Sequence, residues 1–131
     1  MQALPIRLLP GDDLRAALQR VLQAQRCQAA FVLSGIGSLS QTRLRLAGAE
    51  DFQAIDGEVE ILTLAGSLAP DGVHLHMSVA DATGRVVGGH VMAGCTVRTT
   101  AEVLLALLPG WHFARAHDAA TGYAELHISQ P

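Results

Sequence analysis

The sequence predicts an α+β fold: a largely antiparallel, multi-stranded sheet with one main helix near the N-terminus. Apolar residues recur at spacings of three and four in one segment, residues 12–26. Most of the remaining chain alternates with period two or consists of short runs rich in β-branched residues. Turn sequences such as Asp81-Ala82-Thr83-Gly84 separate successive runs, which is typical of antiparallel hairpins. A length of 131 residues fits a single domain, residues 1–131.

The N-terminal segment predicts a strand followed by the helix. Residues 5–10 are a short apolar run that ends at Pro10, and proline cannot donate to a sheet ladder. Asp12 and Asp13 then provide a capping residue and acidic charge for the first turn of helix 12–26. The polar residues of this helix are interpreted as a solvated face: Arg15, Gln19, Arg20, Gln23 and Arg26.

Two further strands are predicted over residues 29–39 and 41–46. The sequence Gly35-Ile36-Gly37 interrupts the first, and a Gly-x-Gly after a strand can cradle phosphate when a helix begins directly after it. An alternating segment follows instead, which favours a bend or bulge within the strand. Arg43 and Arg45 share one face of the second strand, and we interpret them as solvated rather than phosphate-binding.

The rest of the chain predicts strands joined by tight turns. Residues 95–108 contain good helix formers as well as β-branched residues, and we interpret them as a strand because a short, all-round apolar segment suits a central or interface strand. Residues 85–90 are the second arm of a hairpin whose turn is 81–84. The other predicted strands cover residues 58–68, 73–80, 111–116 and 123–129.

Charge and hydropathy argue against two classes of protein, nucleic-acid-binding and membrane-spanning proteins. The nine basic residues are all arginine, are scattered, and are outnumbered by 12 acidic residues, which gives a net charge of −3. The chain therefore lacks the basic patch on which sequence-independent phosphate binding depends, and its charge argues against DNA as a partner. No apolar run approaches the roughly 18 uncharged residues of a membrane span.

The sequence also supports expectations about cellular location and oligomeric assembly. The N-terminus has neither the basic residues nor the long apolar core of a secretory signal, so a cytoplasmic location is expected. Cys27 and Cys95 are isolated thiols, which fits a reducing compartment better than a disulfide framework. Half of the residues are hydrophobic, which for so small a chain indicates that other subunits cover part of its surface.

Three of the six histidines, His74, His76 and His90, fall in one short window. On a strand, residues i and i+2 project to the same side, so His74 and His76 can both coordinate one cation. The glycines at 88 and 89 permit a close backbone approach that brings His90 to the same ion. Three histidines with an open fourth position match a catalytic zinc site or a site for another divalent metal. The alternative is a solvent-facing pair without any ligand.

Glu102 and Cys95 are considered as additional ligands. Glu102 lies in an apolar run, where an unpaired carboxylate is costly to bury, so we expect it to contact the metal, a histidine or Arg98. Cys95 is interpreted as a buried core thiol. The remaining histidines are interpreted as surface or strand-edge residues: His112, His117 and His127.

Several motifs, taken in order, resemble the plants-and-prokaryotes-conserved (PPC) domain family. They lie at residues 10–14, 34–39, 57–62, 74–76, 88–90, 94–97 and 101–103. Together they cover essentially the whole chain, and their order and spacing are specific. The resemblance implies a compact α+β fold with a largely antiparallel sheet, assembled as a homotrimer. The chain resembles a stand-alone, bacterial-type member of the family, because it contains no proline-flanked Arg-Gly-Arg core of an AT-hook.

The resemblance implies two alternative functions for a protein whose biochemical role is otherwise unassigned. Plant members are transcription factors whose AT-hook grips DNA, which suggests a DNA-binding or transcription-associated regulatory module. Their Gly-Arg-Phe-Glu-Ile-Leu element is replaced here by residues 57–62, with Glu58 and Val59 in place of Arg and Phe.

The fold also distantly resembles that of acetolactate decarboxylases, which hold zinc through a His-x-His pair, a further histidine and carboxylates. Matching motif positions would make His74, His76 and His90 the imidazole ligands, with Glu102 as a further candidate. This implies a divalent metal, zinc foremost, a small-molecule ligand, and as the second alternative a metal-dependent enzyme acting on a small carbonyl or carboxylate substrate.

Overall fold

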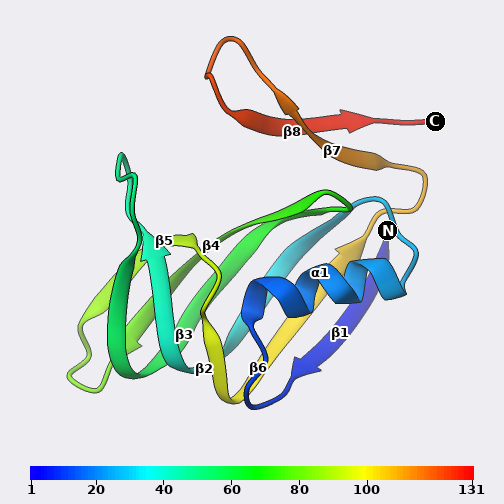
Figure 1. Ribbon diagram of the computed structural model, residues 1–131. Helices are drawn as coiled ribbons and strands as arrows, with labels where there is room; N and C mark the ends of the chain where they lie inside the picture. Colours follow the sequence, from blue (N-terminus) through cyan, green and yellow to red (C-terminus); the bar gives the residue numbers. More distant parts are fainter.

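The computed structural model describes residues 1–131 as one helix packed on a six-stranded sheet, followed by a two-stranded hairpin (Figure 1). In chain order the elements are β1 (Gln2–Leu8), α1 (Leu14–Ala24), β2 (Ala30–Arg45), β3 (Gln53–Ala69), β4 (Gly72–Asp81), β5 (Val86–Val91), β6 (Thr96–Leu107), β7 (His112–His117) and β8 (Ala124–Ser129). The predicted α+β class, antiparallel sheet and single helix are confirmed, as is the interpretation of residues 95–108 as a strand.

The sheet has the strand order β1-β6-β2-β3-β4-β5, and every pairing in it is antiparallel. The C-terminal end of β2 also pairs with β5, where Leu44 is the register partner of Val91 and Arg45 that of His90. This second pairing closes β2, β3, β4 and β5 into a ring at one end of the sheet, which Figure 1 shows beside the N-terminus of α1. The closure places the start of the helix next to β5.

One face of the sheet is covered by α1 and the other face has no helix on it (Figure 1). The helix begins after the N-cap residue Asp13, whose Oδ2 accepts a hydrogen bond from the backbone N–H of Ala16 at 3.0 Å. It buries Leu14, Leu18 and Leu22 completely against the sheet. The larger of two hydrophobic clusters, with 24 buried residues, fills this space.

Several sequence-based boundaries are wrong. The strand predicted at 5–10 is β1, Gln2–Leu8, and the helix predicted at 12–26 is Leu14–Ala24, so its first turn holds no acidic residue. Residues 29–39 and 41–46 are one continuous strand, β2, because the irregularity between them is absorbed by a register shift between Leu39 and Gln41 rather than by a turn. The strand predicted at 58–68 begins at Gln53, so β3 is longer than its apolar core indicates. The bulge interpretation of residues 35–37 is confirmed, because the register between β2 and β6 shifts on both sides of this segment.

The predicted solvated face of the helix is wrong for two of its five residues. Arg15 Nη1 donates a hydrogen bond to the Val91 carbonyl at 3.1 Å, and Gln19 Nε2 donates one to the Ala69 carbonyl at 2.9 Å. Periodicity within a helix cannot reveal these contacts, because the partners come from strands far along the chain. No helix in the structure combines the length and the apolar character that crossing a membrane requires.

The hairpin of β7 and β8 is anchored to the main sheet through Phe113. Its ring is buried against Ala29 and Ala69 and makes an edge contact with Phe31, with the ring centroids 5.4 Å apart. The guanidinium of Arg115 on β7 donates from Nη2 to the Ser67 hydroxyl on β3 at 2.9 Å. The hairpin therefore delivers one arginine to the part of the sheet where β3 pairs with β4.

Candidate metal centre

The β4–β5 hairpin brings three imidazoles together. His74 and His76 lie two residues apart on β4 and point away from the core, whereas Leu75 between them is fully buried. His90 on β5 is the register partner of His76. Directly opposed side chains in an antiparallel pair have Cβ atoms about 4.5–5.5 Å apart. The convergence expected from the sequence therefore arises from the strand period combined with the hairpin register.

The distances among the three side chains suit a shared ion. His74 Nε2 lies 3.0 Å from His76 Nε2. One ring nitrogen from each of the three, His90 included, lies within 4.8 Å of the other two. Two nitrogens bound to one zinc ion at tetrahedral geometry stand about 3.3 Å apart. Small side-chain movements are enough to bring all three to ligand spacing.

Glycines let the strands approach closely enough for this. A Cβ on Gly66 of β3 would collide with the His74 carbonyl oxygen and lie 2.8 Å from the Leu75 Cα. A Cβ on Gly89 of β5 would lie 2.9 Å from the Arg45 carbonyl oxygen. The close approach predicted for the glycines before His90 is thus confirmed, whereas Gly66 was missed. Its signal was an isolated glycine within a strand, which often marks close backbone contact.

The electrostatics of the site favour the neutral forms of His74 and His90, and neutral imidazole is the form that binds metal. Burial, then His76 and Arg115, lower the pKa of His74, which Glu125 partly offsets. Burial lowers the pKa of His90 to about 4, with further contributions from His74 and Arg45. His90 Nδ1 is also buried without any hydrogen-bond partner. A buried nitrogen with an unused lone pair or N–H is a cost that a ligand or second-sphere contact would remove.

A large cleft adjoins His74 and His90. Its volume is about 710 Å³, within the range of small-molecule sites. Three arginines from three different elements line it: Arg15 of α1, Arg45 of β2 and Arg115 of β7. Sequence analysis missed all three, because no local pattern distinguishes them from the six other arginines. The interpretation of Arg45 as solvated is wrong, since its side chain is half-buried in this cleft.

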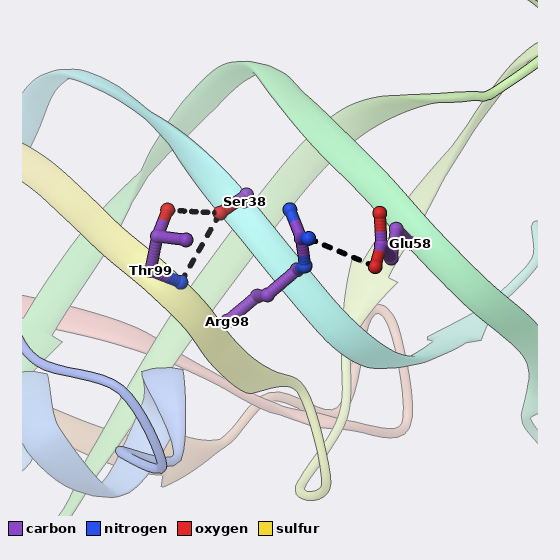
Figure 2. Close-up of polar contacts among 4 residues, drawn as sticks. All are labelled: Ser38, Glu58, Arg98 and Thr99. Atoms are coloured by element: carbon purple, nitrogen blue, oxygen red, sulfur yellow. Dashed lines mark hydrogen bonds and ion pairs between the residues drawn. The ribbon is translucent and has the colours of Figure 1, made fainter.

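Glu102 does not converge with the histidines. It lies on β6, which β2 and β3 separate from β4, and its side chain is exposed. The expectation that it is buried and needs a partner is wrong, because it projects from the sheet face that no helix covers. Arg98 instead extends from β6 across β2, and its Nη2 lies 2.9 Å from Glu58 Oε1 on β3 (Figure 2). Figure 2 also shows Thr99 bonded to Ser38, so these polar groups are satisfied on the open sheet face.

The interpretations of the cysteines and of the other three histidines are confirmed. Cys95 is fully buried, its Sγ donates to the Arg43 carbonyl at 3.3 Å, and burial raises the pKa of its thiol. It is therefore a core thiol rather than a ligand. Both cysteines are free. The histidines outside the cluster are all exposed: His112, His117 and His127.

The chain is similar to proteins of one family. The family model of the Plants and Prokaryotes Conserved (PCC) domain, called PPC above, matches residues 1–109. Two Synechococcus proteins, each named "Bifunctional protein GlmU", match closely: one is 52% identical over 130 residues, which is 99% of this chain and 21% of that protein. The other is 54% identical over 124 residues, 95% of this chain and 20% of that protein. The chain thus spans about a fifth of the length of these curated relatives.

Three solved structures share the fold. A hypothetical protein from Salmonella enterica has a TM-score of 0.95 and 41% identity, covering 98% of this chain and 94% of its own. A metal-containing protein from Archaeoglobus fulgidus has a TM-score of 0.79 and 25% identity, with coverages of 95% and 92%. A protein from Bacteroides thetaiotaomicron with a provisional DNA-binding label has a TM-score of 0.82, with coverages of 98% and 91%. At 15% identity, this similarity shows a shared fold and nothing more.

Proposed function

We propose that this chain, which belongs to the Plants and Prokaryotes Conserved domain family, is a metal-binding domain in which His74, His76 and His90 hold a divalent ion, zinc foremost. The observation that carries the proposal is the convergence of one nitrogen from each imidazole within 4.8 Å. The description of the Archaeoglobus relative as metal-containing supports it. Imidazole suits several first-row metals, and three nitrogens with an open position match the four-coordinate catalytic sites of zinc.

A metal-dependent enzyme acting on a small carbonyl or carboxylate substrate is the more specific form of this proposal. It is favoured by the cleft that His74 and His90 help to line, because a catalytic site needs room for a substrate beside the ion. When bound, such an ion polarises a carbonyl or lowers the pKa of a water. The chain itself contributes the imidazole ligands and a half-buried, arginine-lined wall that would orient the substrate.

Metal analysis of protein purified without a histidine tag tests the proposal. We expect about one equivalent of divalent metal per chain in the unmutated protein after dialysis, and its loss in His76→Ala. His112→Ala is the matched control, because His112 is an exposed histidine on β7 outside the cluster. Unmutated protein that retains no metal after zinc loading, or an equal loss in both variants, would refute the site.

We propose further that the protein is a homotrimer and works in the cytoplasm. Large apolar side chains on the uncovered sheet remain exposed in the single chain: Phe31, Leu33, Ile36 and Leu62. Such a patch usually marks an interface, and three copies is the number implied by the family resemblance. The free thiols fit a reducing compartment.

Light scattering during gel filtration tests the assembly. We expect a trimer that Ile36→Asp dissociates, because a buried carboxylate without a partner is costly at an interface. Val86→Asp is the matched control, since Val86 is equally exposed but lies on β5. A monomeric unmutated protein would overturn the trimer and leave the metal site to be judged separately.

DNA binding is the weaker alternative. Three of the nine arginines line one cleft and Arg98 is paired with Glu58, so few remain to form a basic surface. With a net charge of −3, we expect no retardation of duplex DNA at about 150 mM salt. Retardation that depends on salt in the manner of phosphate contacts would favour this alternative instead.

A further inference from the structure

Three arginines in the cleft carry charge that the chain does not neutralise. Arg15 Nη1 donates to the Val91 carbonyl at 3.1 Å, and Arg115 Nη2 donates to the Ser67 hydroxyl at 2.9 Å. Arg45 Nη1 donates to the Ala49 carbonyl at 3.4 Å. Each of these acceptors is a neutral oxygen, so the contact orients the guanidinium and leaves its positive charge in place.

The contrast with Arg98 shows what a neutralised arginine looks like in this fold. Arg98 has a carboxylate at 2.9 Å, and that ion pair is the structure's single one. The three cleft arginines are half-buried, whereas unpaired arginines elsewhere are mostly exposed to water. A guanidinium has five N–H donors, and each of these three uses one of them within the chain. The remaining donors are available to a ligand in the cleft.

The charge around the cleft is positive before any metal binds. Two acids, Glu50 and Glu125, also line it, and neither is within ion-pair distance of an arginine. Among the side chains that line the cleft, three arginines outnumber these two carboxylates. A divalent ion on the histidines would add two further charges beside these half-buried arginines, where like charges repel more strongly than in bulk water. The charge of the lining residues therefore favours an anion as a ligand of the cleft.

We propose that this cleft binds a small oxyanion, a carboxylate or a phosphate, which Arg15, Arg45 and Arg115 hold beside His74 and His90. The planar fork of arginine pairs with both kinds of oxyanion through two parallel hydrogen bonds. A volume of about 710 Å³ fits a ligand of metabolite size. The ligand's position next to the ion rests on the metal site proposed above, whereas the contribution of the arginines does not depend on metal.

Binding of the anion and of the metal should be coupled. An anion in the cleft lowers the cost of bringing a divalent ion to the histidines, and linkage requires the ion to tighten the anion by the same factor. We expect a factor of about ten, at the lower end of coupling between adjacent sites of opposite charge.

Isothermal titration calorimetry at constant ionic strength tests the proposal with two probes, inorganic phosphate and succinate. Both zinc-free and zinc-loaded protein are titrated, and the probe that binds more tightly identifies the class of oxyanion. In unmutated protein we expect a Kd of about 1 mM or below in the zinc-free form for at least one probe. Arg15→Gln and Arg45→Gln should each weaken it about tenfold or more, because a hydrogen-bonded charge is lost from the contact.

Arg20→Gln is the matched control, because Arg20 lies on the same helix as Arg15 but is exposed and outside the cleft. It should bind both probes as the unmutated protein does. Circular dichroism of each variant checks folding, and Arg45→Gln keeps the test decisive if Arg15→Gln is unstable. Absence of binding for both probes in both forms, or an equal effect of Arg20→Gln, would overturn the proposal.

The outcomes separate this inference from the proposed function. Arginine-dependent anion binding without any zinc binding would support the anion site and refute the metal site. Zinc binding without anion binding would support the metal site and refute the anion site. A duplex DNA oligonucleotide is added as a competitor, since polymer phosphate is the other source of this chemistry. Displacement by DNA more readily than by free phosphate would overturn a small ligand in favour of nucleic acid.

Discussion

Gly66→Ala should weaken the fold and the metal site together. The added Cβ would lie 2.8 Å from the Leu75 Cα and collide with the His74 carbonyl oxygen. Carbon atoms pack at about 3.5–4.0 Å, so β4 must move by roughly 1 Å at the point where His74 leaves the strand. The neighbouring atoms are backbone, so no side-chain rotation can relieve the contact. Overpacking of this kind costs about 2–3 kcal/mol.

Two measurements read out the two effects. In a chain of this length the loss corresponds to a fall of about 10 °C in the unfolding temperature of the zinc-free protein, followed by circular dichroism. The displaced His74 should weaken zinc affinity about 10–100-fold, as changes in the residues supporting a ligand do. Competition with a chelator of known affinity measures the second effect.

Gly37→Ala on β2 is the matched control. Its Cβ would collide with the Thr100 carbonyl oxygen and lie 2.7 Å from the Ala101 Cα, an equivalent clash on β6. We expect a similar loss of stability with unchanged zinc affinity, because two strands, β2 and β3, separate β6 from β4. The reasoning fails if Gly66→Ala unfolds at the temperature of the unmutated protein, or if both variants lose zinc affinity equally.

Further predictions concern pH, capping and thiol reactivity. Because the pKa of His90 is lowered to about 4 and that of His74 is also lowered, the zinc-free folded state binds fewer protons than the unfolded chain below about pH 6.5. The free energy of unfolding should therefore fall as the pH is lowered from about 6.5 to 4, and it should fall less in His90→Gln. Urea unfolding at several pH values measures this, and an equal pH dependence in the two proteins would contradict it. Asp13→Ala removes two hydrogen bonds to backbone N–H groups and should cost about 1–2 kcal/mol in chemical denaturation. Iodoacetamide should label Cys27 in the folded protein while Cys95, buried with a raised pKa, reacts only on unfolding; rapid labelling of both thiols would show that the core opens readily.

Local patterns predicted those elements whose signals are complete within a few residues. Helix α1 was predictable because its cap and apolar stripe are adjacent in sequence. The alternation in β4 placed His74 and His76 on one face without reference to any other strand. The extent of β2 was not predictable, because a bulge continues a strand only if neighbouring strands accept the shift in register.

The candidate site divides in the same way. The sequence determined that three imidazoles come from two arms of one hairpin, since a strand period and a short turn are local properties. Only the tertiary structure decided which charges surround them. Arg15, Arg45 and Arg115 are 30 and 70 residues apart along the chain, and ring closure by β2 and β5 and docking of the β7–β8 hairpin bring them to one cleft. Glu102 is close to His90 in the sequence but lies on β6, which β2 and β3 separate from β4. Strand pairing, and not proximity along the chain, sets a residue's position across a sheet.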